Sequence, residues 1–301
     1  MSQQKQLPKS INFTFGGLAG MGATAVVQPL DLLKNRLQMA GEGKNRKLYT
    51  SSLDAFVKIG RAEGVLGMWN GISAGLLRQA TYTTTRLGIF STLQDRYFAR
   101  EGKNPNILIK GGMALIAGGI GAFVGTPADL TLIRMTSDGR LPEGLRRNYK
   151  NAIEGLVRIS REEGVTKMWN GWRPTVIRAI VVNIAQLASY SQAKQFLLES
   201  KYFKDDILCH FAASLMSGFI TTVASMPVDI CKTRIQNQKP LPDGTLFYKN
   251  SFDVARKVIG KEGIFSLWKG FLPYFARIGP HTVITFILLE QMRKFYIRAF
   301  I

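Results

Sequence analysis

Three arginines lie at equivalent positions in otherwise apolar segments of this 301-residue chain. Arg78, Arg178 and Arg277 are 100 and 99 residues apart. A cationic side chain at the centre of a bilayer costs about 2.5–3.5 kcal/mol, so such residues usually face a polar cavity or a pathway. Guanidinium groups bind carboxylates through two parallel hydrogen bonds. Three of them at one depth therefore predict a binding site for small carboxylates.

Polar side chains that follow these arginines extend the predicted site. Tyr82 and Arg86 are four and eight residues beyond Arg78, and such spacings place residues on one face of a helix. The second repeat adds two neutral groups at comparable positions. The predicted substrate site consists of Arg78, Tyr82, Arg86, Arg178, Asn183, Gln186 and Arg277. An alternative stays open, in which the arginines only bind lipid phosphates or brace helices, and it is strongest for Arg86.

The spacing of the arginines belongs to a repeat that runs through the whole chain. The string Pro-x-Asp begins at positions 29, 127 and 227, and the string Glu-Gly-x4-Trp-x-Gly begins at positions 63, 163 and 262. A tyrosine stands fourteen residues before each of these glutamates. Markers that recur in phase indicate repeated structural units. We predict three repeats, at residues 1–101, 102–201 and 202–301.

Each repeat predicts the same three helices. An uncharged stretch leads to each proline, at 11–30, 111–128 and 207–228, and about 20 such residues can span a bilayer. Amphipathic segments follow at 51–63, 151–163 and 251–262, and second spanning segments at 73–94, 174–194 and 274–293. The arginines should lower the hydropathy of this last set. We therefore predict an all-α membrane protein with six transmembrane helices and three short surface helices.

Small residues four positions apart occur in each of the first spanning segments. The pairs are Gly16 with Gly20, Gly121 with Gly125, and Ser214 with Gly218. Such pairs allow two helices to approach closely in lipid. We expect them at helix contacts, and a role in closing a pore is the alternative.

The composition excludes several other classes of protein. The net charge is +20 although 46% of the residues are hydrophobic, which fits apolar segments separated by basic loops. Zinc, RNP and basic-zipper patterns are absent from the sequence, so no nucleic-acid partner is expected. The two cysteines and two histidines have no metal-site spacing, and neither a metal nor a cofactor is predicted. The first residues show no signal or transit peptide.

The tripled motif Pro-x-Asp with a basic residue three positions later resembles that of the mitochondrial carriers. The Glu-Gly-x4-Trp-x-Gly marker strengthens the resemblance, which covers essentially the whole chain. The resemblance implies a threefold bundle around a central cavity in the inner mitochondrial membrane. It also implies alternating access with a gate on each side, and cardiolipin as a lipid partner. The long loops hold 7, 9 and 8 Lys and Arg against 4 and 3 in the short ones, which places the long loops in the matrix.

The resemblance also implies a gate at the matrix side, where three proline-kinked helices converge. Lys34 and Lys232 follow two of the motif aspartates by three residues, whereas Leu132 stands at the third position. Ion pairs of Asp229 with Lys34 and of Asp129 with Lys232 are therefore expected, and Asp31 lacks such a partner. Thr136 replaces a bracing glutamine in the second repeat. The predicted matrix gate consists of Asp31, Lys34, Gln38, Asp129, Asp229, Lys232 and Gln236. The alternative is that these charges only anchor helix ends at the membrane interface.

A weaker gate is expected on the cytoplasmic side. The family carries an acidic and a basic residue near the end of the second spanning helix of each repeat. Here only Glu290 is acidic, so a single strong ion pair, with Lys194, is available. The predicted cytoplasmic gate consists of Lys194, Glu290 and Arg293. Unequal gates would favour the conformation that is closed at the matrix side.

Taken with the resemblance, the arginine ring favours strict exchange of a 2-oxo dicarboxylate for malate or a related dicarboxylate. A carrier of the uncoupling type is the first alternative, but Gln186 stands where those proteins tend to carry an acid. A membrane scaffold or regulator that no longer transports is the second. An enzyme is disfavoured, because no nucleophile–base pair or metal cluster is found at the depth of the arginines.

Overall fold

The computed structural model describes residues 9–41, 49–200, 205–238 and 245–300, and its regular elements are helices. They are α1 (Lys9–Met39), α2 (Ser52–Gly67), α3 (Ile72–Glu101), α4 (Ile107–Asp138), η1 (Glu143–Leu145), α5 (Ala152–Glu162), η2 (Val165–Trp169), α6 (Trp172–Glu199), α7 (Ile207–Asn237), α8 (Ser251–Glu262), η3 (Ile264–Trp268) and α9 (Phe271–Phe300). Helices α1, α3, α4, α6, α7 and α9 contain 28 to 32 residues. At about 1.5 Å per residue, each is long enough to cross a bilayer. The predicted all-α architecture is confirmed.

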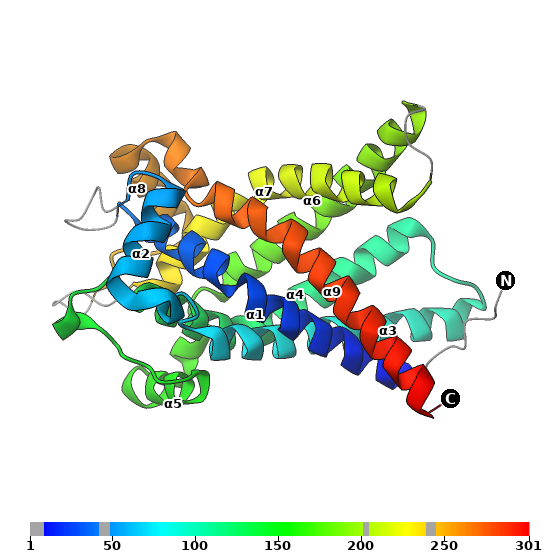
Figure 1. Cartoon of the computed structure of the whole chain (residues 1–301), viewed down its shortest axis with the longest axis horizontal. Helices are drawn as coiled ribbons and strands as arrows, with labels where there is room; N and C mark the ends of the chain where they lie inside the picture. Colours follow the sequence, from blue (N-terminus) through cyan, green and yellow to red (C-terminus); the bar gives the residue numbers. More distant parts are fainter. Residues whose placement is uncertain (1–8, 42–48, 201–204, 239–244, 301) are drawn as a thin grey trace.

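The six long helices pack in a closed ring. Around the ring, α1 contacts α3, α3 contacts α4, α4 contacts α6, α6 contacts α7, α7 contacts α9, and α9 returns to α1. The three short helices α2, α5 and α8 lie together at one end of this bundle, at the left in Figure 1. We call this the long-loop end. Helix α1 begins and α9 finishes at the opposite end, as six crossings require.

The three motif prolines lie inside helices and do not end them. Pro29, Pro127 and Pro227 are followed by about ten further helical residues in α1, α4 and α7. The expected first segments therefore end too early. A proline removes one backbone hydrogen bond, but the next turns can continue the helix if other contacts hold them. These added turns carry the motif aspartates and lysines to the long-loop end.

The short helices begin where their sequences predict, and α5 and α8 also end there, whereas α2 continues past a kink at Gly64 to Gly67. Each first turn is capped by a side chain that accepts a backbone N–H three residues later, at Ser51 (3.1 Å), Asn151 (2.9 Å) and Asn250 (2.9 Å). Such caps satisfy amide groups that have no partner within the helix. Gly164 and Gly263, with φ of 98° and 87°, follow the ends of α5 and α8, and this left-handed region favours glycine.

Small residues lie where two long helices approach each other. A Cβ added at Gly121 or Gly125 of α4 would lie 3.2–3.4 Å from Tyr82 of α3, and one at Gly218 of α7 would lie 3.3 Å from Ile278 of α9. The expectation that the small residues serve helix packing is confirmed at these contacts. It is wrong at Gly16, where an added Cβ would meet nothing within 4 Å.

The hydropathy of the three helices that contain ring arginines was expected to be low, and this holds for two of them. Among the described residues, three segments qualify as membrane spans by length and composition, namely Leu108–Asp138, Leu208–Asn237 and Ile264–Ala299. Helices α3 and α6, which contain ring arginines, fall short as expected. The third arginine helix, α9, qualifies although it contains Arg277, so the expectation is wrong there. The uncharged run at 282–289, between His281 and Glu290, raises the mean hydropathy of this helix.

Candidate substrate site and gates

The three ring arginines project from α3, α6 and α9 but have different partners. Arg178 forms an ion pair with Asp229 of α7, and Arg277 forms one with Asp31 of α1. Arg78 has no ion pair among the described residues, and its buried Nε has no hydrogen-bond partner there. The first repeat therefore presents a guanidinium group without an acid, whereas the other two are already neutralised by carboxylates of the gate.

Tyr274, which no pattern in the sequence singled out, lies between the second and third arginines. Its hydroxyl accepts a hydrogen bond from Arg178 (2.9 Å). The centre of its ring is 5.7 Å from Cζ of Arg178, 5.9 Å from Cζ of Arg277 and 4.4 Å from Nζ of Lys34. Cations at such distances are attracted by the face of an aromatic ring. The residue thus connects the arginine ring to the gate.

The remaining predicted site residues divide into two groups. Arg86 of α3 donates a hydrogen bond to Asn183 of α6 (3.3 Å), so these two side chains meet across the bundle. Tyr82 is packed against the glycines of α4. The side chain of Gln186 is exposed, and the residue contributes its carbonyl oxygen, which accepts from Ser217 (3.1 Å). The structure therefore does not bring Tyr82 or Gln186 into hydrogen-bond contact with the ring.

Both ion pairs expected at the long-loop end are present. Lys34 contacts Asp229, and Lys232 contacts Asp129 at 2.6 Å. All four side chains are at most 8% exposed, so these pairs are buried. They tie α1 to α7 and α7 to α4. Leu132, at the third equivalent position, is itself buried against Ala74 and Ala152.

The bracing residues behave less symmetrically than expected. Gln38 donates a hydrogen bond to Asp229 (2.7 Å) and accepts one from Thr233 (2.7 Å), so it supports the first ion pair. Gln236 instead donates to Thr175 (3.3 Å) and does not contact Asp129. Thr136 accepts from Asn35 (3.0 Å). In this conformation one of the two glutamines acts as a brace.

A second set of cations at the long-loop end was missed in the sequence. Arg36, Arg134 and Arg234, five residues after each motif aspartate, form ion pairs with the glutamates of the three Glu-Gly strings. Each arginine also donates through Nε to a carbonyl of another repeat, at Thr136 (2.9 Å), Gln236 (3.3 Å) and Gln38 (3.3 Å). Each one therefore ties the end of its own short helix to the first long helix of another repeat, namely α4, α7 or α1. Their spacing of 98 and 100 residues was the signal that could have found them.

Among these three pairs, the one at Glu262 should contribute most to stability. Burial raises the pKa of the Glu262 carboxyl. Hydrogen bonds from Arg234 and Lys269 lower it by more than burial raises it, so the pKa lies below the ordinary value. The ionised Glu262 carboxylate therefore makes its full contribution to the free energy of unfolding above the pKa of an unfolded glutamate, about 4.3. This contribution is lost as the pH falls through the lower pKa of the folded state. We expect Glu262→Gln to lower the free energy of unfolding by about 3 kcal/mol at neutral pH, since it leaves a buried arginine unpaired.

Glu163→Gln is the matched comparison. The side chain of Glu163 is 33% exposed against 5% for Glu262, so water replaces part of the lost interaction. We expect a loss of about 1 kcal/mol. Thermal unfolding of the purified variants in detergent would measure both, and equal losses would contradict this ranking.

The ion pair expected at the opposite end, between Lys194 and Glu290, is not formed. Lys194 contacts Asp205 (2.8 Å), and Glu290 contacts Lys294 on its own helix (2.7 Å). Arg293 has no ion pair within the described ranges. The physical reason is the packing of this end. The last turns of α6 pack against the start of α7 through Leu197 and Cys209, so Lys194 faces the connection to α7 and not α9.

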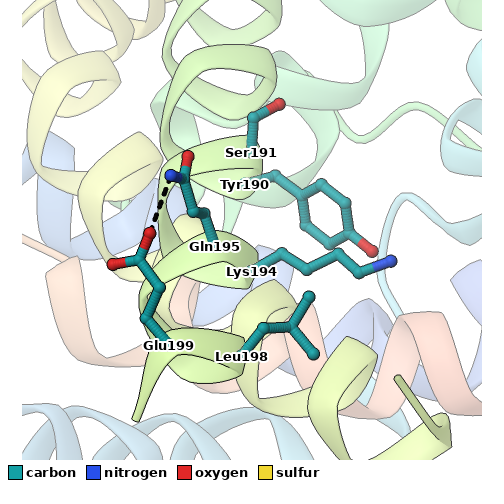
Figure 2. A pocket seen from close by; sticks show the side chains of 6 residues that line it. All are labelled: Tyr190, Ser191, Lys194, Gln195, Leu198 and Glu199. Carbon is teal, nitrogen blue, oxygen red and sulfur yellow. Dashed lines mark hydrogen bonds between the residues drawn. The ribbon is translucent and has the colours of Figure 1, made fainter. Parts of the chain in front are cut away.

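The surroundings of Lys194 form an open pocket on α6, shown in Figure 2. It has a volume of about 490 Å³ and is lined by Tyr190, Ser191, Lys194, Gln195, Leu198 and Glu199. Tyr190 lies on the same side as Lys194 and makes a hydrogen bond with Nδ1 of His210 (2.6 Å), whose Nε2 lies 3.1 Å from Asp205. Asp205, just before α7, thus supplies the partner for Lys194 that α9 was expected to supply.

Comparison with known proteins agrees with this geometry. The family described as mitochondrial carrier protein matches the chain three times, at residues 5–101, 103–201 and 203–300. The mitochondrial 2-oxoglutarate/malate carrier protein of Homo sapiens is 61% identical over 294 residues, which cover 98% of this chain and 93% of the human protein. The protein of the same name from Caenorhabditis elegans is 58% identical over 296 residues, which cover 98% and 96%.

A more distant relative shows the same pattern. A probable mitochondrial 2-oxoglutarate/malate carrier protein of Dictyostelium discoideum is 46% identical over 280 residues, which cover 93% of this chain and 88% of that protein. The three matches to the family correspond to the three copies of the helix–short helix–helix unit in the structure. On the family match, the relatives and the threefold bundle together, this chain belongs to the mitochondrial carrier family.

Proposed function

We propose that this protein exchanges 2-oxoglutarate for malate, or related dicarboxylates, across the inner mitochondrial membrane by alternating access. The observation that carries the proposal is the arginine ring inside the helix bundle, in which two arginines are held by carboxylates. Relatives of about 60% identity that are named for these two compounds support it.

The chemistry of the ring suits a dicarboxylate. Arg78, Arg178 and Arg277 supply three fixed positive charges, and Arg86 adds a fourth beyond them on α3. A substrate with two carboxylates can engage two guanidinium groups at once, which a monocarboxylate cannot do. The hydrogen-bonded pair of Arg86 and Asn183 marks one side of the site and breaks its threefold symmetry. Such asymmetry can orient a molecule whose two ends differ.

The ion pairs at the long-loop end act in this proposal as the matrix gate. They are formed in the present conformation, whereas the cytoplasmic pair of Lys194 and Glu290 is not. The conformation thus corresponds to a carrier closed to the matrix. Repeats 1–101, 102–201 and 202–301 would move as units, and Glu290 would take Lys194 from Asp205 when the cytoplasmic side closes.

Reconstitution in liposomes tests the substrate class. Vesicles loaded with malate should take up labelled 2-oxoglutarate, and external malate or another four- or five-carbon dicarboxylate should inhibit this uptake. Inorganic phosphate and ATP should inhibit weakly or not at all. Vesicles without protein provide the background. Faster uptake of phosphate or nucleotides than of dicarboxylates would refute the proposed substrate class.

We also propose cardiolipin as a bound lipid. A pocket of about 430 Å³ lies between the start of α6 and the start of α8 and is lined by Lys167, Arg173 and Lys249 beside Trp169 and Trp172. Cations next to interfacial aromatic residues suit an anionic headgroup at the membrane surface. Added cardiolipin should raise the thermal unfolding temperature of delipidated protein more than a zwitterionic phospholipid does. An equal effect of both lipids would contradict this.

A further inference from the structure

The first-repeat aspartate of the gate has no lysine partner, and the reason lies in the sequence. Lys34 of α1 reaches Asp229 of α7, and Lys232 of α7 reaches Asp129 of α4. By the threefold symmetry, residue 132 of α4 would reach Asp31 of α1. Leucine at this position cannot neutralise a carboxylate. A buried carboxylate without a partner is costly, so another cation must approach it.

Arg277 of the substrate ring is that cation. Its guanidinium forms a direct ion pair with Asp31, whose side chain is 8% exposed, while that of Arg277 is 21% exposed. Arg78 and Lys34 also interact electrostatically with Asp31, but neither forms an ion pair with it. The pair ties α1 to α9, the first helix of the first repeat to the last helix of the third. It thus belongs both to the site and to the gate.

We propose that Asp31 is an internal competitor of the substrate. Its carboxylate occupies Arg277 until a substrate carboxylate displaces it, and this exchange breaks the tie between α1 and α9. The inference rests on the proposed function, because the displacing group is a carboxylate of the transported compound. The exchange replaces one guanidinium–carboxylate pair by another, so the arginine stays neutralised throughout.

The displacement couples binding to opening. A ligand shifts a conformational equilibrium only through its different affinities for the two states. Substrate that engages Arg277 competes with Asp31, and so it weakens the closed conformation in which that tie exists. After release, no other ion pair among the described residues holds Asp31. Asp229 differs, because it keeps Lys34 and Gln38 when Arg178 leaves it. Asp31 is therefore the acid whose release depends on substrate.

Arg78, which has no acidic partner among the described residues, suggests the order in which the two substrate carboxylates bind. Arg78 has no acid to lose, so the first substrate carboxylate binds there. The second carboxylate then reaches Arg277 and displaces Asp31. A compound with one carboxylate would stop at the first step, and would bind without releasing the gate.

Three variants that raise the net charge by one separate this role from a general electrostatic effect. Asp31→Asn removes the competitor. Leu132→Lys leaves Asp31 in place and gives it a dedicated lysine. Asp129→Asn is the matched control, because Asp129 forms its ion pair with Lys232 and not with a ring arginine. Calorimetric titration of each purified protein with malate and with 2-oxoglutarate gives Kd, and exchange in liposomes gives KM and the maximal rate.

We expect Asp31→Asn and Leu132→Lys to bind both dicarboxylates about tenfold more tightly than the wild type, because Arg277 is then available in most molecules. Their maximal exchange rates should fall. In Asp31→Asn, substrate binding no longer breaks a contact between α1 and α9, and in Leu132→Lys the added lysine strengthens the gate. Asp129→Asn should change Kd less than about threefold. Thermal unfolding in detergent checks that each variant is folded. If Asp31→Asn does not fold, Leu132→Lys still tests whether Asp31 competes with substrate for Arg277.

Several results would overturn the inference. Unchanged or weaker dicarboxylate binding in a folded Asp31→Asn or Leu132→Lys protein would exclude competition at Arg277. An equal gain in Asp129→Asn would show that the added charge alone is responsible. If the wild type itself binds neither malate nor 2-oxoglutarate, the proposed function fails first, and the inference fails with it.

Discussion

Replacing Arg178 with alanine is expected to reduce dicarboxylate exchange to nearly the background of protein-free vesicles. Arg178 is held by Asp229 and by the Tyr274 hydroxyl, so its guanidinium is fixed and partly desolvated before substrate arrives. Removing one member of a buried charge pair typically costs 2–5 kcal/mol. Since about 1.4 kcal/mol corresponds to a factor of ten, the loss should be roughly 30-fold or more. The same result is expected for Arg78→Ala and Arg277→Ala.

Lysine should not rescue these positions. A lysine ammonium keeps the charge but lacks the planar pair of donors that binds a carboxylate at two points. We therefore expect Arg178→Lys to retain only a small part of the exchange rate. Arg298→Ala is the control, because Arg298 is exposed near the end of α9 and far along the chain from the ring. Exchange near the wild-type rate in Arg178→Ala, with normal amounts of protein in the vesicles, would contradict the role of the ring.

Reversing the charges of a gate pair is expected to restore much of the exchange that either single reversal removes. Asp129→Lys and Lys232→Asp each place two like charges together in a buried position, and breaking such a pair costs about 3–5 kcal/mol. Each single variant should therefore lose at least about tenfold in rate. The double variant re-forms an ion pair between the same two helices. Initial exchange rates in liposomes, normalised to protein content, give the comparison.

The pair of Lys34 and Asp229 should show weaker rescue. Asp229 also contacts Arg178 and accepts a hydrogen bond from Gln38, so a lysine at position 229 would repel the arginine even when position 34 is reversed. In the part of the chain that the structure describes, no third cation forms an ion pair with Asp129 beside Lys232. A double reversal at 129 and 232 that is no better than either single variant would refute the gate assignment.

The repeat explains why much of this structure was predictable from the sequence. The spacing of Pro-x-Asp shows which positions are equivalent. The resemblance to the mitochondrial carriers then implied that Lys34 and Lys232 pair with acids on neighbouring helices. The same equivalence identified the arginine ring. Where each residue of a set had the same local sequence, symmetry supplied the long-range contact that a single segment cannot reveal.

The predicted contacts are wrong where the three repeats differ in sequence, or where a side chain has more than one possible partner within reach. Lys194 could reach an acid on α9 or one next to the start of α7, and the packing of α6 against the start of α7 places it beside Asp205. Asp31 lacks its lysine, and only the arrangement of α9 shows that Arg277 replaces it. Gln236 has the expected type but bonds to Thr175. Local sequence does not determine such choices, because they depend on helix tilt and side-chain conformation.

The dependence of uptake on an internal counter-substrate tests the central claim most directly. Purified protein would be reconstituted in liposomes that contain malate or no dicarboxylate, and uptake of labelled 2-oxoglutarate would be followed together with the release of internal malate. A strict exchanger with this arginine site predicts one malate released for each 2-oxoglutarate taken up, and no uptake above background into vesicles without dicarboxylate. Equal uptake into vesicles with and without malate, or conduction of protons in the absence of any dicarboxylate, would contradict it.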